Sequence, residues 1–230
     1  KIGSGDFTAY KYIQEISKFK KPIILSTGLS NSSEVDKTVQ FLKDLDPFYE
    51  IPENIVVMQC TSSYPLGDSE TNLSVIETYK QKYNILPGYS DHTMGMEALF
   101  ASIFFGARVL EFHFTDTREG KTFRDHSISL TKEETKVLKQ RINRGLDFIG
   151  SPDKKLQNEE EKSENIFTFR RGIYPSRDLP KGTEISEDML ICLRPNQGIS
   201  ADKYFSLIGQ KLKRSISKLE AIKEDDLIDE

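Results

Sequence analysis

Each of the three histidines in the chain, His92, His113 and His126, lies in a short block that resembles a strand running into a loop. Neutral imidazole nitrogen is a common ligand of divalent metals, and barrel enzymes carry their catalytic residues at the ends of strands. A single histidine in such a place more often forms a hydrogen bond within a packed loop. Two at successive strand ends favour a metal site instead, and we expect the functional site here.

Two of these histidines are spaced so that they can share one ion. Adjacent parallel strands lie about 4.8 Å apart, so imidazoles at neighbouring strand ends, those of His92 and His113, can each bind the same metal at about 2.1 Å. A site with only two protein nitrogens leaves positions open for water or a substrate oxygen, as a Lewis-acid catalyst requires. We expect Asp91, Glu111 and Asp125 to orient the ligands or their waters.

The predicted strand ends also carry hydroxyl groups, at Ser4, Ser26 and Ser62. Small residues with free backbone N–H groups ahead of helices can hold a phosphate or a carboxylate, and Lys1 would add a cation. Each such group alone is more often an ordinary cap or turn, and Lys1 could equally be a solvated surface residue. Tyr64 either contacts a sugar or is a half-buried ring in a rigid loop.

The elements that must position these residues are predicted by alternating apolar and amphipathic segments. Buried strands are predicted for residues 22–28, 54–60, 85–90 and 108–114. Helices are predicted for residues of about 9–19, 35–45, 94–105 and 131–148. Strands that alternate with helices form a parallel sheet with right-handed crossovers.

With a further strand tip at residues 1–5, these segments amount to about five strand–helix units, which is fewer than the eight of a closed (β/α)8 barrel. The fold is then either a small open sheet or a barrel without its N-terminal portion. The abrupt start at a strand favours the second interpretation.

The pattern changes after residue 150. We expect a first domain at residues 1–150, a Lys-, Glu- and Asn-rich linker at 151–164, and a small β-rich domain at 165–230, near the lower size limit for independent folding. A short strand is predicted at residues 189–195. Arg194 lies at its end, where it could reach an anionic or polyhydroxyl ligand or form only a surface salt bridge.

Composition excludes several classes of protein. The net charge of −4 comes from well-mixed charges, so there is no broad basic face for nucleic acid. No apolar run approaches the roughly 20 residues that span a bilayer, and no signal peptide is recognisable. Cys60 and Cys192 lie far apart without metal-ligand spacing and indicate reduced thiols. We expect a cytoplasmic protein without a nucleic-acid or membrane partner.

Several blocks together resemble the N-acetylneuraminate (sialic acid) synthase family, including legionaminic and pseudaminic acid synthases. The blocks, in family order, are KIGSG at 1–5, KPIILSTG at 21–28, CTSSYP at 60–65, GYSDHT at 88–93 and EFHFT at 111–115. The segments DLPKG at 178–182 and LRP at 193–195 resemble the antifreeze-like (SAF) domain of that family. The resemblance covers nearly the whole chain.

The resemblance implies a fold and an assembly. The fold would be a (β/α)8 TIM barrel, represented here by about strands four to eight, joined to a small SAF domain of the β-clip type. The assembly would be a domain-swapped homodimer in which each SAF domain covers the barrel of its partner. Arg194 would then reach the sugar bound by the other subunit.

The resemblance also implies site residues and a reaction. His92 and His113 would hold a divalent metal, typically Mn²⁺, with Mg²⁺ or Co²⁺ as alternatives. Tyr64 and Asp125 would face the sugar or a metal-bound water, and we expect Asp125 to act in catalysis with the two histidines. The residues expected around phosphoenolpyruvate are Lys1, Ser4, Ser26, Ser62 and Ser90. The product would be a nonulosonic (sialic-type) acid, formed from phosphoenolpyruvate and N-acetylmannosamine or a related 2-acetamido or 2,4-diacetamido hexose, with release of phosphate.

The chain departs from the family in three places. Ser62 stands where many relatives have asparagine, and residues 123–126 read Phe-Arg-Asp-His where the family has Gly-Pro-Asp-His. The family's first three strands, which carry a catalytic glutamate and a phosphate-binding lysine, have no counterpart, so we expect this segment alone to be inactive. A metal-dependent aldolase and a truncated, non-catalytic sugar-binding homologue are the alternatives.

Overall fold

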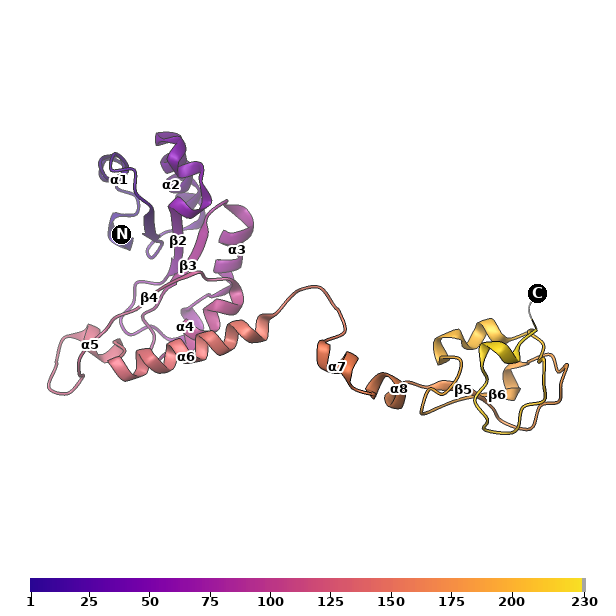
Figure 1. Ribbon diagram of the computed structural model, residues 1–230. Coiled ribbons are helices and arrows are strands. Elements are labelled where there is room, and N and C mark those ends of the chain that lie inside the picture. Colours follow the sequence, from indigo (N-terminus) through magenta and orange to yellow (C-terminus); the bar gives the residue numbers. More distant parts are fainter. Residues whose placement is uncertain (229–230) are drawn as a thin grey trace. The chain divides into compact units, whose positions relative to one another are not determined.

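The computed structural model describes residues 1–228, which form two compact units that divide after Gly150. Figure 1 shows the ribbon of both units. In the first unit the strands are β1 (Ile23–Ser26), β2 (Ile55–Cys60), β3 (Leu86–Ser90) and β4 (Val109–Glu111). Its helices are α1 (Tyr10–Ser17), α2 (Ser32–Leu45), α3 (Ser74–Lys82), α4 (Glu97–Ser102), α5 (Arg124–Ile128) and α6 (Lys132–Ile149).

The first unit is built on a curled parallel sheet that forms half of a barrel. Its strands follow the order β1-β2-β3-β4 and are all parallel. Isolated parallel bridges extend the sheet at both edges, where Ile2 pairs with Leu25 and Leu130 pairs with Phe114. The predicted parallel α/β arrangement is confirmed. Within residues 1–228 the sheet has four strands with one such bridge at each edge, and the bridge at Leu130 was not predicted because a single paired residue gives no apolar run.

Two apolar clusters hold the first unit together. One joins α1 and α2 to β1 and β2 and includes Ile13, Leu25, Val39 and Val57. The other lies against β3, α4 and α6 and includes Tyr89, Leu99, Leu130 and Leu138. Complete burial of an aliphatic side chain of this size contributes about 1.5–3 kcal/mol, so the helices stabilise the face of the sheet that carries Leu25, Val57 and Tyr89.

Two helices of the first unit were not predicted from the sequence. Helix α3 buries only Ile76 and Tyr79 fully, and such a narrow apolar face gives a weak helical pattern. Helix α5 occupies the block around His126, where a strand running into a loop was expected, and that prediction is wrong. Its five residues are too few for a recognisable helical period.

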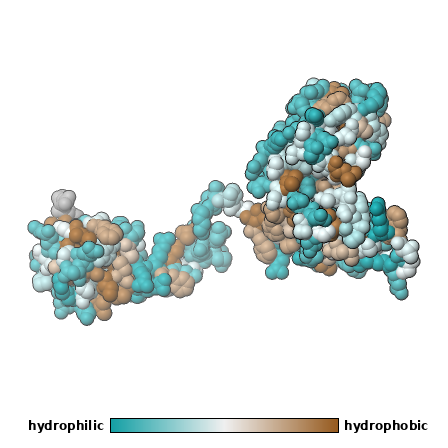
Figure 2. All heavy atoms as spheres, turned by 180° about the vertical axis from the view of Figure 1, so that it is seen from behind, coloured by the Kyte–Doolittle hydropathy of each residue, from teal (hydrophilic) through white to brown (hydrophobic). Residues whose placement is uncertain are grey.

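The second unit contains little regular structure. Strand β5 (Gly172–Pro175) pairs antiparallel with β6 (Leu190–Leu193), which confirms the strand predicted near residue 190. Its core includes Ile173, Leu179, Leu190, Leu212 and Ile222. The helices α7 (Asn158–Lys162) and α8 (Asn165–Phe169) precede β5, so the expected linker contains one turn of helix. That segment is mostly hydrophilic, as its teal surface in Figure 2 shows.

Two expectations about the whole chain can be compared with the structure. Within residues 1–228, no helix combines the length and the apolar character needed to cross a membrane. In the same residues, Cys60 and Cys192 are both free thiols; Cys60 is buried and Cys192 half-buried.

An arginine fixes the loop between β4 and α5. The guanidinium of Arg118 donates to both carboxylate oxygens of Glu134, at 3.0 and 2.6 Å, and to the carbonyl oxygen of Ser129. Glu134 also accepts from the backbone N–H of Thr131 at the start of α6. The hydrogen bonds from Arg118 lower the pKa of Glu134 to about 2. The clamp ties the segment that leads to Asp125 to the longest helix of the unit.

We predict that Glu134→Gln lowers the free energy of unfolding of the first unit by about 0.5–1 kcal/mol at neutral pH, because the exposed ion pair is partly screened by solvent. The folded pKa of about 2 lies below the ordinary value of 4.5, so the carboxylate contributes stability above pH 4.5 that is lost as the pH falls through about 2. Urea titrations followed by circular dichroism at about pH 7 and about pH 2.5 would measure the free energy of unfolding of both proteins and show whether their difference shrinks in acid.

Glu133→Gln is the matched control, since Glu133 lies in the same helical turn and, within residues 1–228, its side chain pairs with Lys136 alone. We expect this control to change stability by a few tenths of a kcal/mol at most. An equal loss in both variants, or a loss that persists in acid, would contradict the role of the clamp.

Candidate functional site

Strand register brings the predicted residues together. Cys60 of β2 pairs with Ser90 of β3, and Ser90 pairs with Glu111 of β4. Side chains alternate between the two faces of a strand, so His92 and His113, two residues beyond Ser90 and Glu111, continue on the same face. The C-terminal ends of these strands therefore present one row of polar side chains.

These side chains line a cavity of about 290 Å³ at the ends of the strands. Most of the predicted site residues are among its walls, namely Lys1, Ser4, Ser26, Ser62, Tyr64, Ser90, His92 and His113. Gly3, Gly5, Leu29, Cys60 and Glu111 complete the lining. The cavity is polar and small, a size suited to compact ligands.

The two histidines of the cavity lie next to each other. Their ring centroids are 5.4 Å apart, and the ring of Tyr64 lies 4.0 Å from that of His92 and 5.7 Å from that of His113. At metal–nitrogen distances of about 2.1 Å, this separation allows both rings to reach one ion. No set of three or more His, Cys, Asp and Glu side chains within residues 1–228 is arranged to hold a metal. The pair therefore offers two nitrogens and leaves the other positions open.

Hydrogen bonding fixes which nitrogen of His92 can act as a ligand. Its Nδ1 lies 2.8 Å from the carbonyl oxygen of Thr61, which can only accept, so Nδ1 carries the proton and Nε2 of the neutral ring keeps its lone pair. Burial lowers the pKa of His92, but hydrogen bonds with Cys60 and with the Thr61 carbonyl outweigh it, and the pKa is raised.

A carboxylate stands beside the second histidine. Oδ2 of Asp125 lies 3.6 Å from Nδ1 of His113, which is longer than a hydrogen bond but close enough for electrostatic attraction. Burial nevertheless dominates and lowers the pKa of His113, so the neutral, metal-binding form prevails at neutral pH. Oδ1 of Asp125 is buried and has no hydrogen-bond partner within residues 1–228. A ligand could supply that partner.

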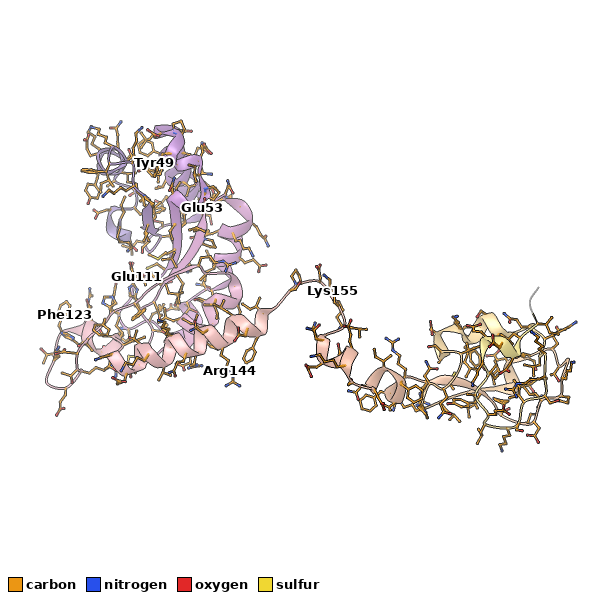
Figure 3. The ribbon with its side chains drawn as sticks, viewed as in Figure 1. Tyr49, Glu53, Glu111, Phe123, Arg144 and Lys155 are labelled. Atoms are coloured by element: carbon orange, nitrogen blue, oxygen red, sulfur yellow. The ribbon has the colours of Figure 1, made fainter. Side chains whose placement is uncertain are left out.

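Glu111, labelled in Figure 3, organises the other side of the cavity. Its carboxylate pairs with the ammonium of Lys1 at 2.9 and 3.0 Å and accepts from the hydroxyl of Ser90 at 2.8 Å. The hydroxyl of Ser26 is buried and, among the described residues, has no partner. At this wall the cation of Lys1 and the hydroxyl of Ser90 are both engaged by Glu111, whereas the hydroxyl of Ser26 is free to donate to a ligand.

A glycine allows two hydroxyls to converge at this wall. A Cβ atom at Gly28 would lie 2.2 Å from Oγ of Ser62 and 2.6 Å from Oγ of Ser4, closer than atoms can approach. Hydroxyls and a lysine around a small pocket are the donors that a phosphate or carboxylate requires. The arrangement can therefore bind an anion beside the two imidazoles.

One interpretation of the sequence is wrong at this site. Asp91 faces away from the cavity, as the alternation along the strand requires, and its carboxylate accepts from the hydroxyl of Tyr89 and from the backbone N–H of Thr93, both at 2.9 Å. It cannot orient the metal ligands. His126 is not among the cavity walls either, because it lies in α5 with its Nδ1 3.0 Å from the hydroxyl of Thr115.

Sequence reasoning missed one residue of the cavity wall and one contact beside it. Cys60 was interpreted only as a reduced thiol, but it lines the cavity, and its position two residues before Ser62 could have indicated the shared face. Burial raises the pKa of its thiol, but hydrogen bonds with His92, Ser4 and Ser90 outweigh burial and lower it. Arg124 lies over the ring of Tyr64, and a contact between segments so far apart in the chain cannot be predicted from local sequence pattern.

Arg194 lies in the second unit, directly after β6. Its Nε donates to the carbonyl oxygen of Phe169 at 2.6 Å, and it is not among the residues that line the cavity of the first unit. Its assignment to a sugar remains a prediction from the resemblance.

Similar proteins identify the family. The N,N'-diacetyllegionaminic acid synthase of Campylobacter jejuni is 34% identical over 224 residues, which are 97% of this chain and 65% of that protein. The crystal structure of the N-acetylneuraminic acid (sialic acid) synthetase of Leptospira borgpetersenii in complex with citrate has a TM-score of 0.64 at 28% identity, over 70% of this chain and 54% of that one. The chain spans about two thirds or less of the length of its curated relatives.

The fold is shared more widely. A spore coat polysaccharide biosynthesis protein of Chromobacterium violaceum has a TM-score of 0.77 at 22% identity, over 98% of this chain and 66% of that one. Residues 1–154 match the NeuB family and residues 170–228 match the SAF domain, in agreement with the resemblance of the sequence motifs. The chain therefore belongs to the NeuB family and carries a SAF domain.

Proposed function

We propose that the protein containing this chain condenses phosphoenolpyruvate with N-acetylmannosamine or a related 2-acetamido or 2,4-diacetamido hexose, yielding a nonulosonic acid and inorganic phosphate. The observation that supports it most directly is the histidine pair beside an anion-accepting wall in one cavity, with the ring centroids 5.4 Å apart. Family membership agrees with this chemistry. The whole protein, rather than this chain alone, is the unit to which we assign the activity.

In this proposal Lys1 and the cavity hydroxyls hold phosphoenolpyruvate. The ammonium of Lys1 neutralises one of its negative charges, and the hydroxyls of Ser4, Ser26, Ser62 and Ser90 donate to its phosphate and carboxylate oxygens. The free hydroxyl of Ser26 fits this role, since its buried oxygen has no partner within residues 1–228. These contacts orient C3 of the substrate toward the acceptor.

His92 and His113 would hold a divalent ion, which we propose to be Mn²⁺, with Mg²⁺ or Co²⁺ as alternatives. The tautomer that the Thr61 carbonyl imposes on His92 fits a ligand role. When bound, such an ion supplies Lewis acidity that polarises the aldehyde oxygen of the open-chain sugar.

The acceptor sugar would lie against Tyr64 and Asp125. The unpartnered Oδ1 of Asp125 accepts a hydrogen bond from a sugar hydroxyl or from water, and Oδ2 attracts His113 electrostatically at 3.6 Å. In the reaction, C3 of phosphoenolpyruvate forms a bond to the aldehyde carbon, whose oxygen takes up a proton. Water adds at C2, and phosphate leaves with cleavage of its C–O bond, which yields the 2-keto acid.

We also propose the assembly that such a site requires. The curled sheet would supply strands to a (β/α)8 barrel, and two copies would form a domain-swapped homodimer. In that dimer the Arg194 of one copy would contact the sugar bound to the other copy. Sedimentation of the full-length protein would test the dimer.

The function is tested with the full-length protein, phosphoenolpyruvate, Mn²⁺ and a panel of 2-acetamido and 2,4-diacetamido hexoses. We expect phosphate release that depends on one of these sugars, together with a product whose mass equals that of the nonulosonic acid. A condensation without phosphate release would support the aldolase alternative. Sugar binding without any turnover would support a non-catalytic homologue.

We predict that His92→Ala abolishes Mn²⁺ binding and lowers kcat by more than about a hundredfold. Mutating a residue that only supports a metal ligand already lowers metal affinity or activity by about 10–100-fold, and loss of the ligand itself should cost more. Isothermal titration with Mn²⁺ and the phosphate-release assay would measure both effects. His126→Ala is the matched control, since His126 does not line the cavity, and we expect its Mn²⁺ affinity to match the unmodified protein. An unchanged titration in His92→Ala would remove this residue from the site.

We predict that Gly28→Ala lowers kcat/KM for phosphoenolpyruvate by roughly a hundredfold, because the added methyl displaces the hydroxyls of Ser62 and Ser4. Gly67→Ala is the control, because a Cβ there meets only a side-chain oxygen of Glu70 at 3.9 Å. Steady-state kinetics with varied phosphoenolpyruvate compares the two variants. Equal kinetics in both would show that the hydroxyls do not bind the anion.

A further inference from the structure

A cation covers the aromatic ring at the edge of the cavity. The guanidinium carbon of Arg124, at the start of α5, lies 4.6 Å from the ring centroid of Tyr64. The same ring lies 4.0 Å from that of His92, one of the two imidazoles of the cavity. The ring of Tyr64 therefore lies between Arg124 and the histidines of the proposed reaction centre.

The donors of this guanidinium are largely unused. Nε lies 3.4 Å from Oδ1 of Asp125, beyond ordinary hydrogen-bond length, and the side chain is 63% exposed. Among residues 1–228, the guanidinium of Arg124 donates to no acceptor, so both terminal nitrogens are free there, and Oδ1 of Asp125 is itself buried without a partner.

A guanidinium that lies over an aromatic ring and keeps its terminal nitrogens unpaired can bind one kind of ligand. The cation–π contact with Tyr64 restrains Arg124 beside the cavity, and the N–H groups of a guanidinium lie in its own plane. Two parallel N–H groups match the oxygens of a phosphate or a carboxylate. Asp125 occupies only the Nε side, so an anion can bind at the opposite edge.

We infer that Arg124 determines acceptor specificity by binding an anionic substituent, a phosphate or a carboxylate, at the end of the sugar that is remote from its aldehyde. This inference rests on the proposed function, which places the aldehyde at His92 and His113 and assigns the anion of phosphoenolpyruvate to the wall at Lys1. Arg124 then supplies a separate cation for the acceptor. The chain would act on a phosphorylated or acidic amino sugar in preference to a neutral one.

The test compares a 2-acetamido hexose, its 6-phosphate and the corresponding uronic acid as acceptors of the full-length protein. We expect kcat/KM at least about tenfold higher for one of the anionic acceptors. Arg124→Gln should remove that preference and leave the neutral acceptor within about twofold. Arg124→Lys should retain part of it, and the KM for phosphoenolpyruvate should stay unchanged in both variants.

Arg144→Gln is the matched control, because Arg144 lies over the ring of Phe148 on α6, with 5.4 Å to its centroid. Figure 3 labels Arg144 on that helix. We expect its acceptor preference to match the unmodified protein. A stronger preference for the neutral sugar, an equal loss for all acceptors in Arg124→Gln, or an increased KM for phosphoenolpyruvate would overturn the inference.

Binding measurements separate this inference from the proposed function. If no acceptor gives turnover, the synthase proposal fails, and calorimetric titration with the sugar 6-phosphate still tests Arg124. Binding that Arg124→Gln weakens at least about tenfold, and that Arg144→Gln leaves intact, would support an anion site at Arg124. Equal binding in both variants would reject it.

Discussion

The in-register pairing of β2, β3 and β4 is the constraint on which the site depends. Because Cys60, Ser90 and Glu111 are aligned across the sheet, the residues two positions further on share one face. A slip of one residue in any of these strands would turn its side chains to the opposite face. The two imidazoles are thus adjacent because of main-chain hydrogen bonds rather than contacts of their own.

Close packing at the opposite wall adds a second constraint. Gly28 permits the hydroxyls of Ser4 and Ser62 to occupy space that any other residue would fill. Glu111 holds Lys1 and Ser90 through a single carboxylate, so the cation and the hydroxyl keep a fixed distance from each other. Such preorganisation removes part of the cost of binding a charged ligand.

The sequence predicts those parts of the molecule that depend on local pattern. The buried strands, the long helices and the meeting of His92 and His113 at one edge follow from apolar periodicity and from the geometry of parallel sheets. The prediction for Asp91 was wrong because it ignored this geometry. Side chains alternate along a strand, so Asp91, which lies between Ser90 and His92, faces away from the cavity. Sequence reasoning also missed α5 and the contact between Arg124 and Tyr64. Neither has a local signal, because a short helix lacks a period and the contact joins segments far apart in the chain.

The segment that follows β2 is attached to His92 at both of its ends. The carbonyl of Thr61 accepts from the imidazole, and the backbone N–H of Leu66 donates to the carbonyl oxygen of His92 at 2.9 Å. Ser62 and Tyr64 lie between these two anchors. If a ligand that shifts Ser62 also moves the Thr61 carbonyl, it changes the binding free energy of a ligand at His92, and thermodynamic reciprocity makes that coupling equal in the reverse direction.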